Sequence, residues 1–148
     1  MIRRALFAAA LVLAAQPALA SAKKGEGKVE VGQYVDLSPV AMPIVVDGQL
    51  VNYIFVYVRI NLTRGANSVK LREKEPFFRD ALVRAGHRTP FTKADDYMVV
   101  DTVKLSSTLQ REAAAIAGPG MVRSVVVTSQ APKKRAGVPR PRAAEARS

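Results

Sequence analysis

The stretch QLVNYIFVYVRINLT, residues 49–63, alternates regularly between two kinds of side chain. One set of alternate positions is wholly aliphatic: Ile54, Val56, Val58, Ile60 and Leu62. The other set is aromatic at Phe55 and Tyr57 and polar at Arg59 and Asn61. A repeat of two residues is typical of a β-strand, because successive side chains point to opposite faces of the sheet. The stretch therefore predicts a long strand with one buried face and a second face that meets solvent at its polar end.

The aromatic side chains Phe55 and Tyr57 have two interpretations. Aromatic rings bury a large apolar surface, so packing in the protein core under a helix is their commoner role. In the other interpretation both rings stay on the surface and contact a partner. We keep both interpretations open and name Phe55 and Tyr57 as candidate interaction residues.

A first strand is predicted over residues 34–46, YVDLSPVAMPIVV. Pro39 and Pro43 lack a backbone N–H, so this strand is expected to lie at an edge of the sheet or to be broken. Asp47 and Gly48 follow it, directly before the alternating stretch. An Asp-Gly pair favours a two-residue type I′ turn, which requires positive φ at both central positions. The two strands are therefore expected to form a hairpin.

An amphipathic helix is predicted over residues 68–85. Its apolar stripe, with helical spacing, consists of Leu71, Phe78, Ala81, Leu82 and Ala85. Basic side chains lie on the opposite face, and among them Arg79 and Arg84 are candidate interaction residues. Pro76 either kinks this helix or marks the start of a shorter one at the preceding residue. Gly86 is expected to be the C′ residue, because glycine readily adopts the left-handed conformation that ends many helices.

A second helix is predicted over residues 102–117, with Asp101 as its N-cap. Its apolar stripe consists of Leu105, Leu109, Ala113 and Ile116. The sequence Gly-Pro-Gly at residues 118–120 ends the helix.

A final strand is predicted over residues 121–129, MVRSVVVTS, which are rich in β-branched side chains, and Pro132 ends it. Because this strand is too apolar to stand alone, we expect it to pair with residues 49–63. The order of hairpin, helix, helix and strand predicts an α+β fold. In this fold a small antiparallel-type sheet carries two amphipathic helices packed on one face.

The N-terminus predicts export. Residues 1–4 include two arginines, residues 5–15 form an apolar run, and residues 18–20, Ala-Leu-Ala, have the small-x-small form that signal peptidase accepts. We predict a secretory signal that is cleaved after Ala20 or Ala22. The apolar run is shorter than the roughly 20 residues of a membrane-spanning helix. An uncleaved N-terminal membrane anchor is the alternative.

The formal charge of +11 is concentrated at the ends of the chain. The C-terminal tail contains one acidic residue and six basic ones: Lys133, Lys134, Arg135, Arg140, Arg142 and Arg147. The rest of the chain is only mildly basic, so no nucleic-acid partner is expected. Lys133, Lys134 and Arg135 are candidate residues of a tail that either contacts an anionic membrane surface or another polyanion, or is simply solvated.

These features divide the chain into four parts. They are a signal peptide over residues 1–20, a flexible linker over 21–30, an α+β domain over 31–132 and a disordered basic tail over 133–148.

The sequence contains no recognisable catalytic or ligand-binding pattern. There is no cysteine, and His87 is the only histidine, so metal sites with His/Cys spacing are excluded. His87 is expected just past the end of the first helix. Asp95 and Asp96 lack the alternating acids and the glycine of an oxygen-ligand loop. We therefore expect a non-enzymatic protein with no cofactor, no metal and no small-molecule substrate.

Three segments of the chain resemble the FliL family of flagellar basal-body-associated proteins. The segments are NYIFVYVRINL, EPFFRDALVRAG and LSSTLQREAAAIAGPGMVRSVVVTS. In that family a similar strand is followed by a helix that begins P-x-hydrophobic-R-D, which corresponds here to Pro76, Phe78, Arg79 and Asp80. A later helix ends before a glycine and a valine-rich strand, as residues 118–127 do.

The resemblance covers about residues 50–129 and implies the periplasmic, stomatin-like domain of that family. It also implies self-association and a link to the flagellar stator units. Family members keep an uncut N-terminal helix, whereas the leader of this chain is expected to be removed. We therefore expect a periplasmic FliL-like protein that binds an envelope protein or a second copy of itself. Anchoring in the inner membrane, facing the periplasm, is the alternative location.

Overall fold

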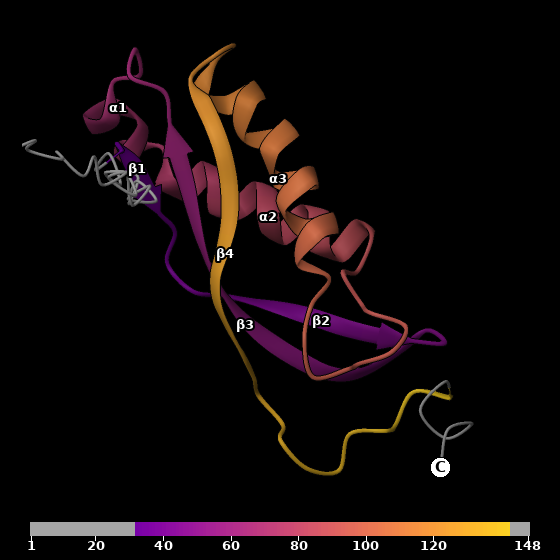
Figure 1. The fold of residues 1–148 in the computed structure, drawn as a ribbon. Helices are drawn as coiled ribbons and strands as arrows, with labels where there is room; N and C mark the ends of the chain where they lie inside the picture. The colour runs from indigo at the N-terminus through magenta and orange to yellow at the C-terminus, as the bar shows by residue number, and fades with distance from the viewer. Residues whose placement is uncertain (1–31, 143–148) are drawn as a thin grey trace, which may run out of the picture.

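The computed structural model describes residues 32–142. Within them the chain forms an α+β fold, in which an antiparallel four-stranded sheet carries helices on one face (Figure 1). In chain order the elements are β1 (Tyr34–Asp36), β2 (Val40–Val46), β3 (Gln49–Leu62), α1 (Ser68–Glu73), α2 (Glu75–Arg88), α3 (Thr102–Ala117) and β4 (Val122–Pro132). The predicted fold class is confirmed. The predicted signal peptide, the linker and the last residues of the tail lie outside the described residues.

The strand β3 is the centre of the sheet and pairs with every other described strand. β1 and β2 follow one another along one edge of β3, and β4 lies along the other edge. The predicted first strand is therefore broken, with Asp36 opposite Arg59 and Val40 opposite Val56. The break falls at residues 37–39, which include a proline. Both prolines of this region lie along an edge of the sheet, where a missing N–H disrupts pairing least.

The turn between β2 and β3 is the predicted two-residue hairpin. Val46 pairs with Gln49, and both residues between them have positive φ, 48° at Asp47 and 74° at Gly48. These are the left-handed conformations that a type I′ turn requires. The prediction from the Asp-Gly pair is confirmed.

The protein core lies between the sheet and the helices α2 and α3. Five aliphatic side chains on one face of β3 are each at most 2% exposed: Ile54, Val56, Val58, Ile60 and Leu62. From the helices, Phe78, Leu82, Leu105 and Leu109 join them in one cluster. Fully burying a side chain of this size contributes roughly 1.5–3 kcal/mol to folding. The alternation in β3 therefore identifies the buried face of the sheet correctly.

The helical region after β3 is divided into α1 and α2. Pro76 lies in the first turn of α2, where its missing N–H takes no intrahelical hydrogen bond away. The expectation of one helix over residues 68–85 is therefore wrong. The alternative, a new helix that begins at the residue before Pro76, is confirmed. The predicted apolar stripe is buried along both helices, because α1 and α2 contribute to the same core.

The helix α2 continues to Arg88, so Gly86 lies within it. The prediction of Gly86 as C′ residue is wrong, and so is the placing of His87 beyond the helix end. Gly86 is buried, and an added Cβ would lie 2.9 Å from Met42 Sδ and 3.6 Å from Cε2 of Phe91. The missing side chain therefore allows α2 to approach β2 closely.

The helix α3 has the predicted bounds and the predicted cap. The Asp101 side chain accepts a hydrogen bond from the backbone N–H of Lys104 at 2.9 Å. The helix ends at Gly118, whose φ of 101° is unfavourable for other residues. The chain then returns as β4, which pairs antiparallel with β3 as predicted and continues to Pro132.

Candidate functional site

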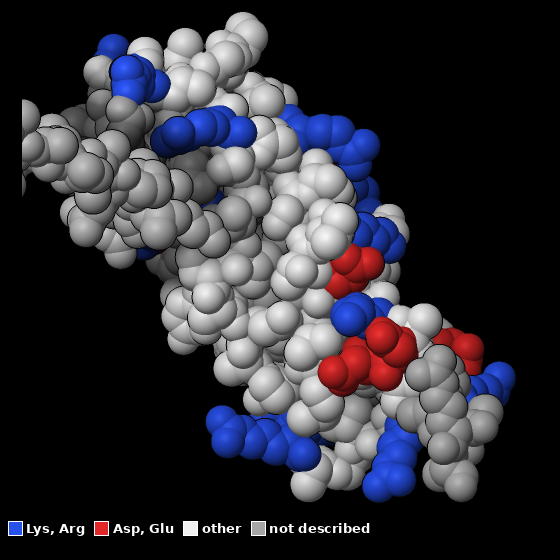
Figure 2. Space-filling view, in the orientation of Figure 1, with Lys and Arg blue, Asp and Glu red and all other residues white. Residues whose placement is uncertain are grey.

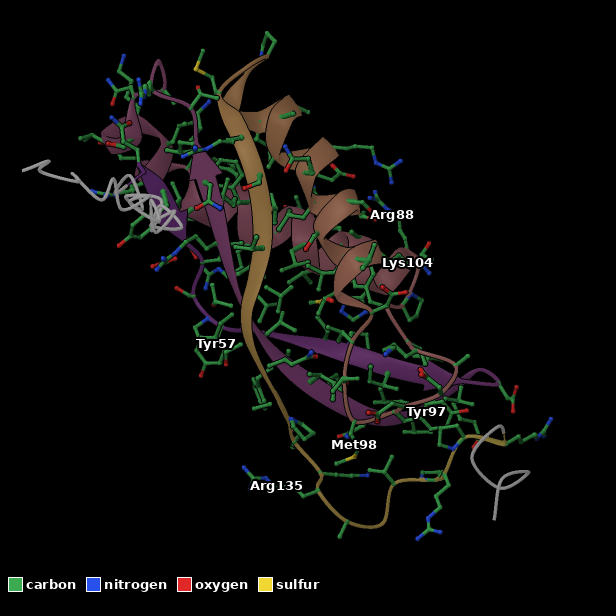
Figure 3. All side chains as sticks on the ribbon, viewed as in Figure 1. Tyr57, Arg88, Tyr97, Met98, Lys104 and Arg135 are labelled. Atoms are coloured by element: carbon green, nitrogen blue, oxygen red, sulfur yellow. The ribbon has the colours of Figure 1, made fainter. Side chains whose placement is uncertain are left out.

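The sheet has a second face, formed by the side chains of β3 and β4 that point away from α2 and α3; we call it the outer face. On β3 it carries Phe55 and Tyr57, which are 39% and 42% exposed. Figure 3 shows Tyr57 projecting from β3 on the side away from these helices. The interpretation of both rings as core residues is therefore wrong for the described part of the chain, and they lie on the surface.

The strand β4 extends this surface beside the two rings. Small residues, Ala131 and Ser129, lie opposite Phe55 and Tyr57, and Val126 further along β4 is 40% exposed. In Figure 2 the middle of the visible face is largely free of charged side chains, which gather toward its ends and one side. Because their neighbours on β4 are small, both rings remain accessible to a partner.

Arg59 lies at the polar end of the outer face, where it is paired with neighbouring side chains. Its Nε donates to Asp36 Oδ1 at 2.7 Å and its Nη2 to Oδ2 at 3.0 Å, and its guanidinium lies 3.9 Å from the centroid of the Tyr34 ring. The hydrogen bond to Asp36 raises the pKa of Arg59. On the same face Asn61 donates to Ser124 Oγ at 2.9 Å. The polar groups at this end are therefore paired within the sheet, which leaves the rings as the apolar centre of the face.

Asn52 is the buried polar residue of the described range, at 2% exposure. Its Oδ1 accepts from the backbone N–H of Lys134 at 3.1 Å, and its Nδ2 donates to the carbonyl of Lys134 at 3.2 Å. The backbone N–H of Lys133 also donates to the carbonyl of Tyr53 at 2.7 Å. The hydrogen-bonded part of the fold therefore extends to Lys134, past the domain boundary expected at residue 132.

We did not predict this role of Asn52 from the sequence, although one signal for it is present in β3. Asn52 has the same alternate phase in β3 as the buried aliphatic residues, so the strand directs its side chain into the protein. A buried amide must find hydrogen-bond partners. The signal indicates that a partner is needed, but it does not indicate which residue provides it.

The basic candidates of the tail lie close to β3. Lys133 Nζ is 5.8 Å from the centroid of the Tyr53 ring, and Lys134 is held through its backbone by Asn52. Arg135 is exposed and projects from the chain that continues β4 (Figure 3). The structure thus places the aromatic and the basic tail candidates along β3 and the continuation of β4.

Arg79 and Arg84 lie elsewhere, on α2. Arg79 Nε is 3.7 Å from Glu75 Oε1, and Arg84 Nη2 is 3.0 Å from Asp80 Oδ2. Both are pairs four residues apart on a helix surface, and exposed pairs of this kind contribute only about 0.3–0.5 kcal/mol. Because α2 packs on the opposite face of the sheet, these two residues do not join the outer face.

The two edges of the sheet differ in how their backbone groups are used. At β2 the hydroxyl of Thr92 accepts from the N–H of Val45 and donates to its carbonyl, both at 3.1 Å. Among the described strands β4 pairs only with β3. Beside it a groove of about 550 Å³ separates residues 124–127 from α3. Because no described strand pairs with its outer edge, β4 offers backbone groups to which an extended segment can add.

The residues considered for metal chemistry have local roles. Within residues 32–142, no group of three His, Cys, Asp or Glu side chains could hold a metal ion. Asp95 Oδ1 lies 3.6 Å from Lys93 Nζ, and Asp96 Oδ1 accepts from the backbone N–H of Met98 at 2.7 Å. In the same part of the chain, no helix has the length and apolar character needed to span a membrane.

The comparisons with known proteins do not assign the chain to a family. No family model matches the sequence, and no curated protein matches it either. The fold and the surface together define an α+β domain with one sheet face exposed.

Proposed function

We propose that this protein is an exported, non-enzymatic interaction domain of FliL-like type. It self-associates or binds an envelope protein through the outer face of its sheet. The observation that carries the proposal is the exposure of Phe55 and Tyr57, two aromatic rings on a central strand beside small residues of β4. Exposed aromatic residues with an apolar surround are typical anchors of protein interfaces.

The unpaired edge of β4 adds further contact area to the outer face. A specific protein interface buries about 800 Å² on each partner, which is more than two rings provide. The outer face and the β4 edge adjoin, so a partner that covers the rings can also reach backbone groups of β4 that pair with no described strand. Addition of a strand to a sheet edge is a common way of binding an extended segment.

The FliL-like type rests on the sequence segments and on the order of elements, a hairpin followed by helices and a last strand beside β3. The proline at the start of α2 is part of the resemblance. On this proposal the partner belongs to the cell envelope, and the flagellar basal body is the first place to look for it. Deletion of the protein is then expected to reduce motility, and normal motility would contradict this link.

Export is tested by the N-terminal residue of the protein recovered from its native cell. We expect Ser21 or Lys23, the residues after the two predicted cleavage positions. Met1 in a membrane fraction would instead support the anchored alternative. Intact protein with Met1 in the cytosol would contradict export in either form.

The interaction is tested by replacing both rings with serine, as Phe55→Ser and Tyr57→Ser. Both side chains are exposed, so the fold is expected to persist, and the oligomer or envelope complex of the unchanged protein is expected to dissociate. Phe77→Ser is the matched control, because Phe77 is 62% exposed but lies on α2. Mass measurement by light scattering distinguishes the results. An unchanged complex in the double variant would contradict the proposal.

A second candidate function is binding of an anionic membrane surface through the tail. It is favoured by the anchoring of Lys133 and Lys134 to β3, which holds the following basic residues at one end of the sheet. Each cation near an anionic surface contributes about 1 kcal/mol. Vesicles of anionic lipid should retain the full chain at low salt and release it at high salt. Retention that is unchanged after removal of residues 135–148 would contradict this function.

A further inference from the structure

A cleft of about 610 Å³ lies on the helical layer of the protein, between the C-terminal end of α2 and the part of α3 from Lys104 to Glu112. Its volume falls in the range of small-molecule sites. Ala85 and Phe91, both buried, contribute its apolar lining. The cleft is separate from the outer face, because α2 and α3 cover the opposite side of the sheet.

Three basic side chains from two helices line this cleft: Arg88, Lys104 and Arg111. Figure 3 shows Arg88 and Lys104 on neighbouring parts of α2 and α3. Lys104, Thr108 and Arg111 are spaced by four and three residues, so they share one face of α3. Positive charges from two helices therefore lie around one cleft.

The acidic lining of the cleft is limited to Glu112, whose Oε1 is 3.0 Å from Arg88 Nη2. Lys104 Nζ makes a long hydrogen bond of 3.4 Å to the carbonyl of Pro90. Arg111 makes no hydrogen bond or ion pair with another residue of the described range. The cleft therefore has a formal excess of positive charge, and the guanidinium of Arg111 keeps its donors available.

We propose that this cleft binds a phosphate group. A guanidinium presents parallel N–H donors that match phosphate oxygens, and an ammonium adds a compact positive charge. Arg111 and Lys104 bind the phosphate from α3, where Thr108 lies between them on the same face, and Arg88 lines the site from α2. A ligand with two negative charges suits the site best, because three basic side chains against Glu112 leave a formal excess of two positive charges in the lining.

The phosphate can belong to a small solute or to a lipid headgroup, and two probes distinguish these sources. Inorganic phosphate is titrated into the full chain at constant ionic strength, with chloride as the reference salt, and amide chemical shifts are followed. In the second experiment the full chain is mixed with phosphatidylcholine vesicles, with or without phosphatidic acid, whose headgroup is a phosphate monoester.

We expect saturable binding of at least one probe, with shifts centred on α3 and the end of α2 for phosphate. Arg111→Gln and Lys104→Gln should each weaken it by roughly tenfold, the effect of losing a charge-assisted hydrogen bond. Both side chains are exposed, so the variants are expected to fold. Phosphate binding that depends on Arg111 identifies a solute site, and vesicle binding alone with the same dependence identifies a lipid headgroup.

Arg84→Gln is the matched control, because it removes one positive charge from α2 outside the cleft, where Arg84 is paired with Asp80. It should change the affinity less than twofold, within the effect of one screened surface charge. Equal weakening by Arg84→Gln and Arg111→Gln would show a diffuse charge effect and overturn the proposal. Absence of saturable binding with both probes would overturn it as well. Either result leaves the outer-face proposal intact, because different residues carry it.

Discussion

The side-chain amide of Asn52 makes two hydrogen bonds to the backbone of Lys134: its Oδ1 accepts from the N–H at 3.1 Å, and its Nδ2 donates to the carbonyl at 3.2 Å. The same amide oxygen accepts from the N–H of Tyr53 at 2.8 Å. One buried side chain thus replaces a pair of strand-to-strand hydrogen bonds and joins the chain after β4 to the first half of β3. The basic tail begins from this fixed point.

Replacing Asn52 by alanine should release the chain after β4. The variant loses both hydrogen bonds to Lys134, so the free energy of unfolding should fall by about 1–3 kcal/mol. Hydrogen exchange at the Lys134 amide should become faster. Asn61→Ala is the control on the same strand, because it removes a side-chain hydrogen bond to Ser124 instead. Urea unfolding and amide exchange measure both effects, and unchanged exchange at Lys134 in Asn52→Ala would contradict this role.

Gly86→Ala should destabilise the protein, although glycine-to-alanine changes inside helices usually stabilise by about 1 kcal/mol. The new Cβ would lie 2.9 Å from the sulfur of Met42, whose side chain is fully buried. We expect a loss of about 1–3 kcal/mol from overpacking, measured by urea unfolding. Gly65→Ala is the control, because nothing lies within 4 Å of a Cβ added there.

A double-variant comparison identifies the cause of that loss. In a Met42→Ala background the added methyl group of Gly86→Ala has space, so its cost should be smaller than in the unchanged protein. A gain of stability from Gly86→Ala alone would show that α2 does not pack as closely on β2 as the structure has it.

Asp101→Ala should weaken α3 at its first turn. The Asp101 side chain accepts from the N–H of Lys104, and loss of an N-cap costs about 1 kcal/mol. Asp101→Asn and Asp101→Ser keep an acceptor and should retain most of the stability. Thermal unfolding of the three variants gives the comparison. Equal losses in all three would indicate that the charge of Asp101, and not its capping hydrogen bond, supports the helix.

Arg59→Met should cost little stability, and the cost should depend on salt more than on pH. Hydrogen bonding to Asp36 raises the pKa of Arg59, so its contribution is complete below the ordinary arginine pKa and is lost only as pH rises into the strongly alkaline range. The pair is partly exposed and therefore screened by salt. Unfolding of both proteins at low and high salt near neutral pH should show a difference that shrinks with salt. A difference that salt leaves unchanged would indicate that packing on Tyr34 dominates.

Local signals predicted most of the fold. The alternation in residues 49–63 gave the buried face of β3, and the Asp-Gly pair gave the hairpin, because each feature depends on neighbouring residues alone. Asp101 and Gly118 likewise set the ends of α3 through local backbone conformation. The pairing of β4 with β3 followed from the need of an apolar strand for a partner.

Long-range packing explains what the sequence could not predict. Glycine is the residue type expected at a helix C′ position. Gly86 instead lies close to Met42, in a strand more than 40 residues earlier in the chain. The contact between Asn52 and Lys134 spans 82 positions. The exposure of Phe55 and Tyr57 depends on which face the helices cover, and aromatic composition is compatible with either face. The separation of Arg79 and Arg84 from the rings has the same origin.

We infer that the outer face of the sheet is the contact surface of this protein, and site-specific photo-cross-linking in the native cell is the decisive experiment. A photoreactive residue is placed at position 57, on the outer face, and in a parallel protein at position 77, where Phe77 is 62% exposed on α2, away from both the outer face and the β4 edge. We predict a cross-linked product larger than the monomer from position 57 and none from position 77. A product from position 77, or no product from position 57, would contradict this role of the outer face.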